Sequence, residues 1–131
     1  MSEVVADLYE NDYIMRMIHD MIRALAKIIF HKDIDEWEQI SFRDEEAGKL
    51  FSELDGLLYK KDLKGAQSLL ESRLDVECLE NLKVALLFYD RLNQLEDSEL
   101  EEYGISREDL EEQVRNVMEK FGYGDLGDFL L

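Results

Sequence analysis

The chain has 131 residues, of which 46% are apolar and 36% are charged, and it contains no proline. Its length fits a single domain, residues 1–131, and its apolar content is too high for a disordered chain. Proline is common in the turns and edges of β proteins. Its absence, together with abundant Leu, Glu, Lys, Met, Ala and Arg, predicts an all-α fold.

The formal net charge of −17 argues against several classes of partner. Nucleic-acid binding needs a cationic surface that displaces counterions, so we expect no nucleic-acid partner and no membrane partner. No apolar run reaches the length of a membrane span, and the first ten residues lack the pattern of a signal peptide. We therefore expect a cytoplasmic protein whose acidity serves solubility or attracts a basic partner.

A first helix is predicted from Asn11 or Asp12 to Lys32, after a frayed N-terminus at residues 1–11. Its apolar residues form two rows, which are Ile14, Ile18, Met21, Leu25 and Ile28, and Met15, Ile22 and Ile29. So wide an apolar arc predicts contacts on two sides, one within the domain and the other with a second copy. We therefore predict a homodimer whose contact residues on this helix are Met15, Ile18, Ile22 and Ile29.

Four more helices are predicted downstream, which with the first give an antiparallel bundle of about five helices. Residues 33–42 are interpreted as a helical turn or a loop that folds back on the core. The helical patterns cover residues 43–60, 62–74, 76–95 and 106–121, with one further turn at 96–104. Asp62 is a candidate cap, Ser106 and Asp109 form a variant of the capping box, and Gly122 is placed to end the last helix. No strand is predicted, because no window alternates with a period of two.

Two short features allow limited interpretation. The single cysteine, Cys78, excludes an intramolecular disulfide and is interpreted as a small core residue. The tail, residues 123–131, ends in Phe129, Leu130 and Leu131. We expect it to dock on its own core, and the alternative is an exposed apolar hook for a partner or a second subunit.

The segment from Leu50 to Leu74 resembles a tetratricopeptide unit. Residues of the expected size occupy five motif positions, Leu50, Leu57, Leu63, Ala66 and Leu70. The segment departs from the motif at Leu54 and Arg73, where small residues are preferred, and at Cys78, where the motif has its closing proline. Such repeats need about three units for independent stability, and no second copy is present. We therefore predict a single tetratricopeptide-like helical hairpin.

The opening helix carries a second resemblance. Residues 12–18 read Asp-Tyr-Ile-Met-Arg-Met-Ile. This stretch resembles the DY-[IL]-M-R-M-I opening of a family of uncharacterised helical proteins from Gram-positive bacteria, in which tetratricopeptide-like helices follow. The resemblance is specific for this helix and loose over the rest of the chain. It implies a helical fold and brings no activity, because the family is a domain of unknown function.

The sequence shows no spacing typical of a catalytic or metal site. His19 and His31 lack the neighbours that helical di-iron and zinc sites require, and both are interpreted as structural. The glycines lack the spacing of a phosphate loop, and no serine lies in a nucleophile elbow. We therefore expect no metal, no cofactor and no enzymatic activity. Catalysis by a pair among the 32 acidic residues is the less favoured alternative.

Residues 96–112 form an acidic stretch in which nine of 17 residues are Asp or Glu and only Arg107 is basic. Acids at the start of the last helix are explained by the helix dipole. The candidates for a face that binds a basic partner are Glu99, Glu101, Glu102 and, at the start of that helix, Glu108. The predicted function is a non-catalytic interaction or scaffold module with an unknown protein partner. The alternative is an acidic inhibitor or nucleic-acid mimic that binds a basic protein.

Overall fold

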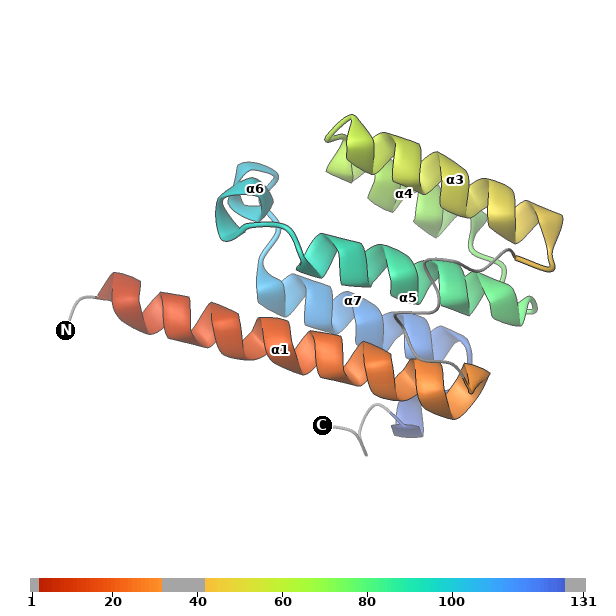
Figure 1. Ribbon diagram of the computed structural model, residues 1–131, viewed down its shortest axis with the longest axis horizontal. Coiled ribbons are helices and arrows are strands. Elements are labelled where there is room, and N and C mark those ends of the chain that lie inside the picture. The colour runs from red at the N-terminus through yellow and green to blue at the C-terminus, as the bar shows by residue number, and fades with distance from the viewer. Residues whose placement is uncertain (1–2, 32–41, 127–131) are drawn as a thin grey trace.

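Helices make up most of the described chain (Figure 1). The structure, a computed structural model, describes residues 3–31 and 42–126, with side chains from Asn11 onward. Its helices are α1 (Glu3–Phe30), α3 (Glu45–Tyr59), α4 (Leu63–Arg73), α5 (Leu79–Asn93), α6 (Asp97–Glu102) and α7 (Arg107–Lys120). No strand occurs in these two ranges, which confirms the predicted all-α class. Over the same ranges, no helix combines the length and apolar character needed to cross a membrane.

Helix α5 occupies the centre of the fold. It packs against α1, α3 and α7, and Figure 1 shows it between the α3–α4 pair and the α1–α7 pair. Twelve of its 15 residues are buried, which explains why apolar residues surround most of its axis. Tyr89 is among them, and burial, reinforced by the charge of Glu71, raises the pKa of its phenol.

Each of the four buried polar side chains of α5 has a partner outside the helix; they are Asn81, Lys83, Asp90 and Asn93. These partners matter because an unpaired buried polar group costs about 1–3 kcal/mol. The Asn81 side chain accepts a hydrogen bond from the backbone N–H of Asp75. The Lys83 ammonium lies 5.0 Å from the centre of the Phe42 ring. Asp90 faces His19, and the Asn93 amide donates to the backbone of α1. These contacts fix the rotation of α5 about its axis.

The predicted local caps are confirmed. Asp62 accepts a hydrogen bond from the N–H of Gly65 at the start of α4. Ser106 and Asp109 form a reciprocal capping box at the start of α7, with both hydrogen bonds at 3.0 Å. Gly122 ends α7 with a φ of 85°. Each of these helix caps involves residues that are close together in the sequence, which explains why the sequence alone predicts them.

Helices α3, α6 and α7 end in the same hydrogen-bond pattern. A residue with positive φ follows each helix, and the next N–H bonds to a carbonyl five residues earlier, which is the Schellman arrangement. After α6 and α7 that residue is Gly104 or Gly122, but after α3 it is Lys61, with a φ of 62°. A lysine side chain is strained in this region, whereas glycine is not.

Several predicted boundaries and burials were wrong. Helix α1 begins at Glu3, so residues 3–11 are helical and not frayed. They contain neither proline nor glycine, so nothing in the sequence breaks the helix there. Helix α5 begins at Leu79 and not at Val76, because Cys78 adopts the extended conformation of an N-cap residue. Cys78 is half-buried there rather than a core residue.

Part of the C-terminal tail packs on the domain. Tyr123 and Leu126 are half-buried against the core. The final residues, Phe129, Leu130 and Leu131, lie outside the described residues, as does most of the segment 33–42. The two interpretations of the extreme C-terminus therefore stay predictions.

We expect Lys61→Gly to stabilise the protein by about 0.5–1 kcal/mol, because glycine removes the strain of a side chain at positive φ. Chemical denaturation measures the free energy of unfolding. Lys60→Gly is the matched control, since Lys60 has an ordinary φ of −80° and should lose roughly 0.5–1 kcal/mol. Equal destabilisation by both substitutions would contradict the strain at Lys61.

Candidate functional site

A buried arginine organises the end of the molecule at which α5, α6 and α7 meet. Arg107 is the first residue of α7 and is 4% exposed. Its Nε and Nη2 atoms donate to Oδ1 of Asp97 over 3.2 and 3.0 Å. Its Nη1 atom donates to the backbone oxygen and the side-chain oxygen of Asn93, and Nη2 also donates to the carbonyl of Leu95 over 2.6 Å. Arg107 thus binds carbonyls that the end of α5 leaves without helical partners.

The Arg107 contacts continue into α1 through Asn93. The side-chain amide of Asn93 donates to the backbone oxygen of Met15 over 2.8 Å. One polar network therefore connects α7, α6, α5 and α1. A guanidinium has five N–H donors, and the contacts of Arg107 use all five. Arg107 consequently has no donor left for an external anion, and its role is structural.

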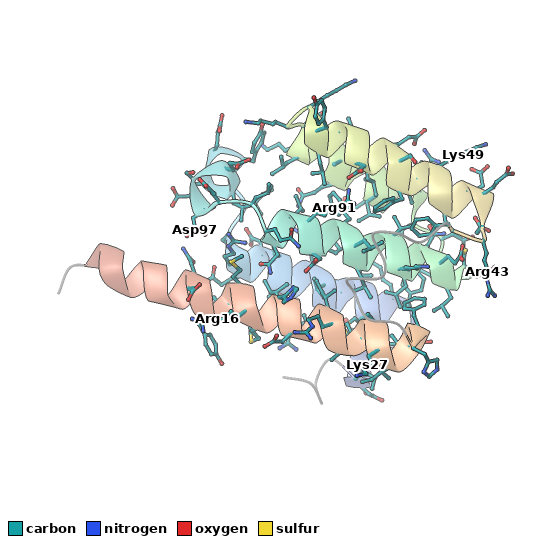
Figure 2. The ribbon with its side chains drawn as sticks, in the orientation of Figure 1. Arg16, Lys27, Arg43, Lys49, Arg91 and Asp97 are labelled. Atoms are coloured by element: carbon teal, nitrogen blue, oxygen red, sulfur yellow. The ribbon has the colours of Figure 1, made fainter. Side chains whose placement is uncertain are left out.

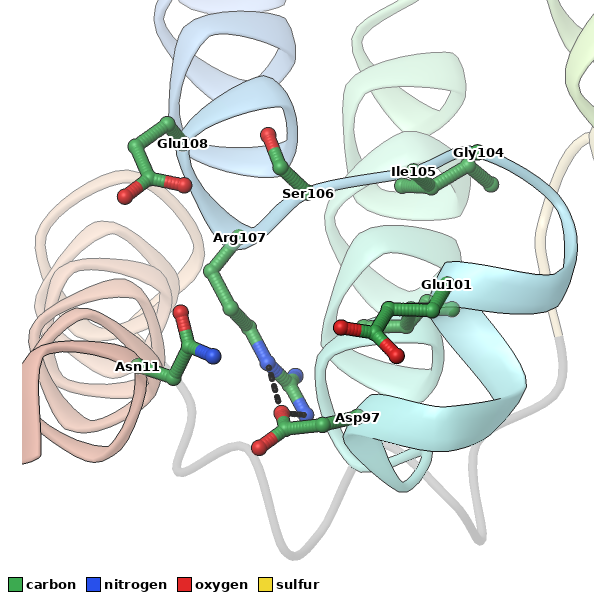
Figure 3. Close-up of a pocket in the computed structure, with 9 residues that line it drawn as sticks. Asn11, Asp97, Glu101, Gly104, Ile105, Ser106, Arg107 and Glu108 are labelled. Carbon is green, nitrogen blue, oxygen red and sulfur yellow. Dashed lines mark hydrogen bonds and ion pairs between the residues drawn. The ribbon is translucent and has the colours of Figure 1, made fainter. Parts of the chain in front are cut away.

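A pocket of about 380 Å³ lies next to this network. We call it the acidic pocket; its lining comprises Asn11, Asp97, Leu100, Glu101, Gly104, Ile105, Ser106, Arg107 and Glu108. Figure 3 shows these residues coming from α1, α6 and the start of α7. Leu100 and Ile105 are buried, whereas Glu101 and Glu108 are exposed. Within the part of the chain that the structure describes, neither glutamate forms an ion pair.

The structure brings together only half of the predicted acidic face. Glu101 and Glu108 line the acidic pocket, whereas Glu99 lines a different pocket and Glu102 lines neither. On the short helix α6, Asp97 and Glu101 are four residues apart and lie on one side, whereas Glu99 and Glu102 lie on another. Helical spacing in the sequence could therefore have divided the four glutamates and added Asp97 to the pocket.

A second pocket, which we call the hairpin groove, lies between the α3–α4 turn and α6. It has a volume of about 310 Å³ and is lined by Asp55, Leu58, Tyr59, Lys61, Leu63, Arg91, Leu95 and Glu99. Leu58 and Leu95 are half-buried and pack against the core, and Leu63 is fully buried. Tyr59 is 90% exposed, more than any other large hydrophobic residue of the described chain. The lining of the groove therefore combines three leucines and an exposed aromatic side chain with four charged residues.

Two residues, Arg91 and Tyr103, hold the walls of the hairpin groove in place. Arg91 of α5 forms an ion pair with Asp55 of α3, and its guanidinium lies 4.8 Å from the centre of the Phe51 ring. Figure 2 shows Arg91 in the space between α3 and α5. The hydroxyl of Tyr103, just after α6, donates to the carbonyl of Lys61 in the α3–α4 turn. The groove is thus a fixed feature of the fold, although its residues are far apart in the sequence.

The predicted self-association residues on α1 do not form a surface. Ile18 and Ile22 are 0% exposed because they are covered by the chain's own core, so they cannot contact a second copy. Met15 and Ile29 are half-buried, and Ile29 packs against the same core. The prediction was wrong for Ile18 and Ile22. The sequence pattern predicted that the second side of α1 contacts another copy of the chain. That side packs within the chain instead, since α1 contacts both α5 and α7.

The two histidines are separated from both pockets. His19 Nδ1 lies 3.0 Å from Oδ1 of Asp90, whose other oxygen accepts a hydrogen bond from the side chain of Gln94. This contact joins α1 to α5. His31 follows α1 with a φ of 57°. Among the described residues, no group of three or more His, Cys, Asp and Glu side chains is placed to hold a metal ion.

We expect Arg107→Met to destabilise the protein by at least about 3 kcal/mol, because methionine keeps the length but leaves the Asn93 and Leu95 carbonyls without donors. Urea denaturation measures the change. The matched control is Arg16→Met, which removes an exposed ion pair with Asp12 and should cost less than about 0.5 kcal/mol. Similar losses for both variants would show that Arg107 does not hold the four helices together.

Comparison with known proteins places the chain in a family. Neither the curated proteins nor the solved structures gave a match. The family model described as "Family of unknown function (DUF6483)" matches residues 8–122. This range includes most of α1, all of α3 to α7 and every residue that lines the acidic pocket or the hairpin groove. The expectation of an uncharacterised family is thereby confirmed. The chain belongs to the family of unknown function DUF6483.

Proposed function

We propose that the chain is a non-catalytic protein-interaction module that contacts other proteins through the hairpin groove. The observation that carries this proposal is Tyr59, which is 90% exposed beside a pocket lined by leucines. Tyrosine is enriched among the residues that dominate binding energy, because it buries a large area and loses little conformational freedom. Leaving such a side chain in water favours a role in recognition.

The composition of the hairpin groove supports this function. Leu58 and Leu95 give it partly exposed apolar surface, and Lys61 and Glu99 supply charge. An apolar centre with a polar rim is the usual anatomy of a protein interface. The ion pair between Arg91 and Asp55 fixes one wall in advance, which reduces the entropy lost on binding.

The α3–α4 pair supplies most of the groove, and we propose that it is a tetratricopeptide-like hairpin. The two helices are in contact and are joined by a turn of three residues, 60–62. Leu50, Leu63, Ala66 and Leu70 are buried, as the large and small positions of such a unit require. Paired helices of repeat proteins commonly form concave binding surfaces. The likeness of the α3–α4 pair to such units supports binding of a protein segment. We also propose a Gram-positive origin, which the opening motif of α1 implies.

Affinity capture from native cytoplasm tests the proposed function with two matched variants. We expect Tyr59→Ala to reduce the recovery of bound proteins about tenfold, because alanine removes the exposed ring without creating a cavity. Tyr13→Ala is the control, since Tyr13 is also exposed, at 68%, but lies on α1 away from the groove. Equal recovery by wild type and both variants would contradict a binding role for the groove.

A second candidate function is binding of a basic partner at the acidic pocket, as an acidic inhibitor or nucleic-acid mimic would do. Glu101 and Glu108 favour it, because they come from separate elements and neither is neutralised by an ion pair in the described ranges. The buried Leu100 and Ile105 could contact the aliphatic part of a lysine or arginine side chain.

Titration with an arginine-rich peptide tests this second candidate. We expect the Glu101→Gln/Glu108→Gln variant to bind at least about fivefold more weakly than Glu77→Gln/Glu102→Gln, which has the same net charge. The difference should shrink as salt rises, because screening weakens interactions between exposed charges. Equal affinities of the two variants would assign any binding to overall charge and remove the acidic pocket as a site.

A further inference from the structure

We infer that the hairpin groove binds a second copy of this chain, so that two copies form a dimer with two-fold symmetry. This inference rests on the proposed function and names the partner. It replaces the face of α1 from which a homodimer was predicted, since Ile18 and Ile22 are inside the core.

The same face carries both a projecting side chain and a pocket. Tyr59 projects from the last turn of α3 and is 90% exposed. Its inner side lines the same pocket as Leu58, Leu63 and Leu95, and this pocket has a volume of about 310 Å³, which exceeds that of a phenol ring. A two-fold axis between the copies would place each Tyr59 at the leucine-lined pocket of the other.

The two walls of the groove carry opposite charges. Lys61 lies in the α3–α4 turn, with Lys60 and Lys64 exposed beside it, and Glu99 lies on α6. The Tyr103–Lys61 hydrogen bond holds these two walls next to each other. In the described part of the chain, neither Lys61 nor Glu99 forms an ion pair. A two-fold axis would bring Lys61 of each copy toward Glu99 of the other.

Symmetry explains why a second copy fits better than an unrelated chain. In a two-fold interface the same patch occurs on both partners, so it must be complementary to itself. A projection beside a pocket, and a positive wall beside a negative wall, both satisfy this condition. The three lysines at residues 60, 61 and 64 also matter because the chain has only 15 basic residues and a net charge of −17. They place positive charge where two acidic molecules would approach each other.

Sedimentation velocity on the full chain between about 1 and 300 µM tests the dimer. We expect a reversible dimer for wild type and for Tyr13→Ala. The dissociation constant of the Tyr59→Ala dimer should be at least about tenfold larger. Circular dichroism verifies that both variants keep their helices. A wild type that is monomeric throughout this range would overturn the dimer. So would a dimer that Tyr59→Ala leaves unchanged.

Charge reversal tests the contact between Lys61 and Glu99 directly. Lys61→Glu and Glu99→Lys should each weaken the dimer, because each creates two like-charge contacts. An equimolar mixture of the two variants should form a heterodimer, since both contacts are then between opposite charges. Glu99→Lys is the sharper case because it also lowers the overall repulsion between copies. A tighter dimer of Glu99→Lys, or no heterodimer in the mixture, would contradict this arrangement.

These results also separate the dimer from the more general function. If wild type is monomeric but Tyr59→Ala still loses captured proteins, the groove binds a different partner, so the dimer is wrong and the proposed function stands. If Tyr59→Ala affects neither association nor capture, both are wrong.

Discussion

The buried guanidinium of Arg107 is the interaction on which the arrangement of the helices depends. It binds the carbonyl oxygens of Asn93 and Leu95 at the end of α5 and the carboxylate of Asp97 at the start of α6. Asn93 extends the network to the backbone of α1. Charged groups are costly to bury unless every donor is satisfied, and all donors of Arg107 are. The direction in which the chain leaves α5 is therefore closely constrained.

Both candidate surfaces follow from this constraint, because both are formed around α6. Arg107 and Asp97 line the acidic pocket on one side of α6, and Leu95 and Glu99 line the hairpin groove on the other. Helix α6 has only six residues and could not hold its position alone. Arg107 fixes its start, and Tyr103 fixes its end to the α3–α4 turn. A single short helix thus separates an acidic surface from an apolar one.

The sequence predicted features that depend on neighbouring residues and missed those that depend on distant ones. The caps at Asp62, Ser106 and Gly122 involve residues within a few positions of one another. The contacts of Arg107 with Asn93 and of Tyr103 with Lys61 join residues 14 and 42 positions apart, and no local pattern indicates them. For Ile18 and Ile22, the apolar pattern showed correctly that α1 is covered on two sides. It did not show that the chain covers both sides itself.

In both proposals the exposed ring of Tyr59 becomes covered by protein. ¹⁹F NMR of protein labelled with fluorotyrosine tests it most directly, with the Tyr59 resonance assigned by Tyr59→Phe among the six tyrosines of the chain. As protein concentration rises, or as a captured partner is added, the Tyr59 resonance should shift and broaden while that of Tyr13 stays constant. A Tyr59 resonance that keeps the position of a solvent-exposed ring under both conditions would contradict the account.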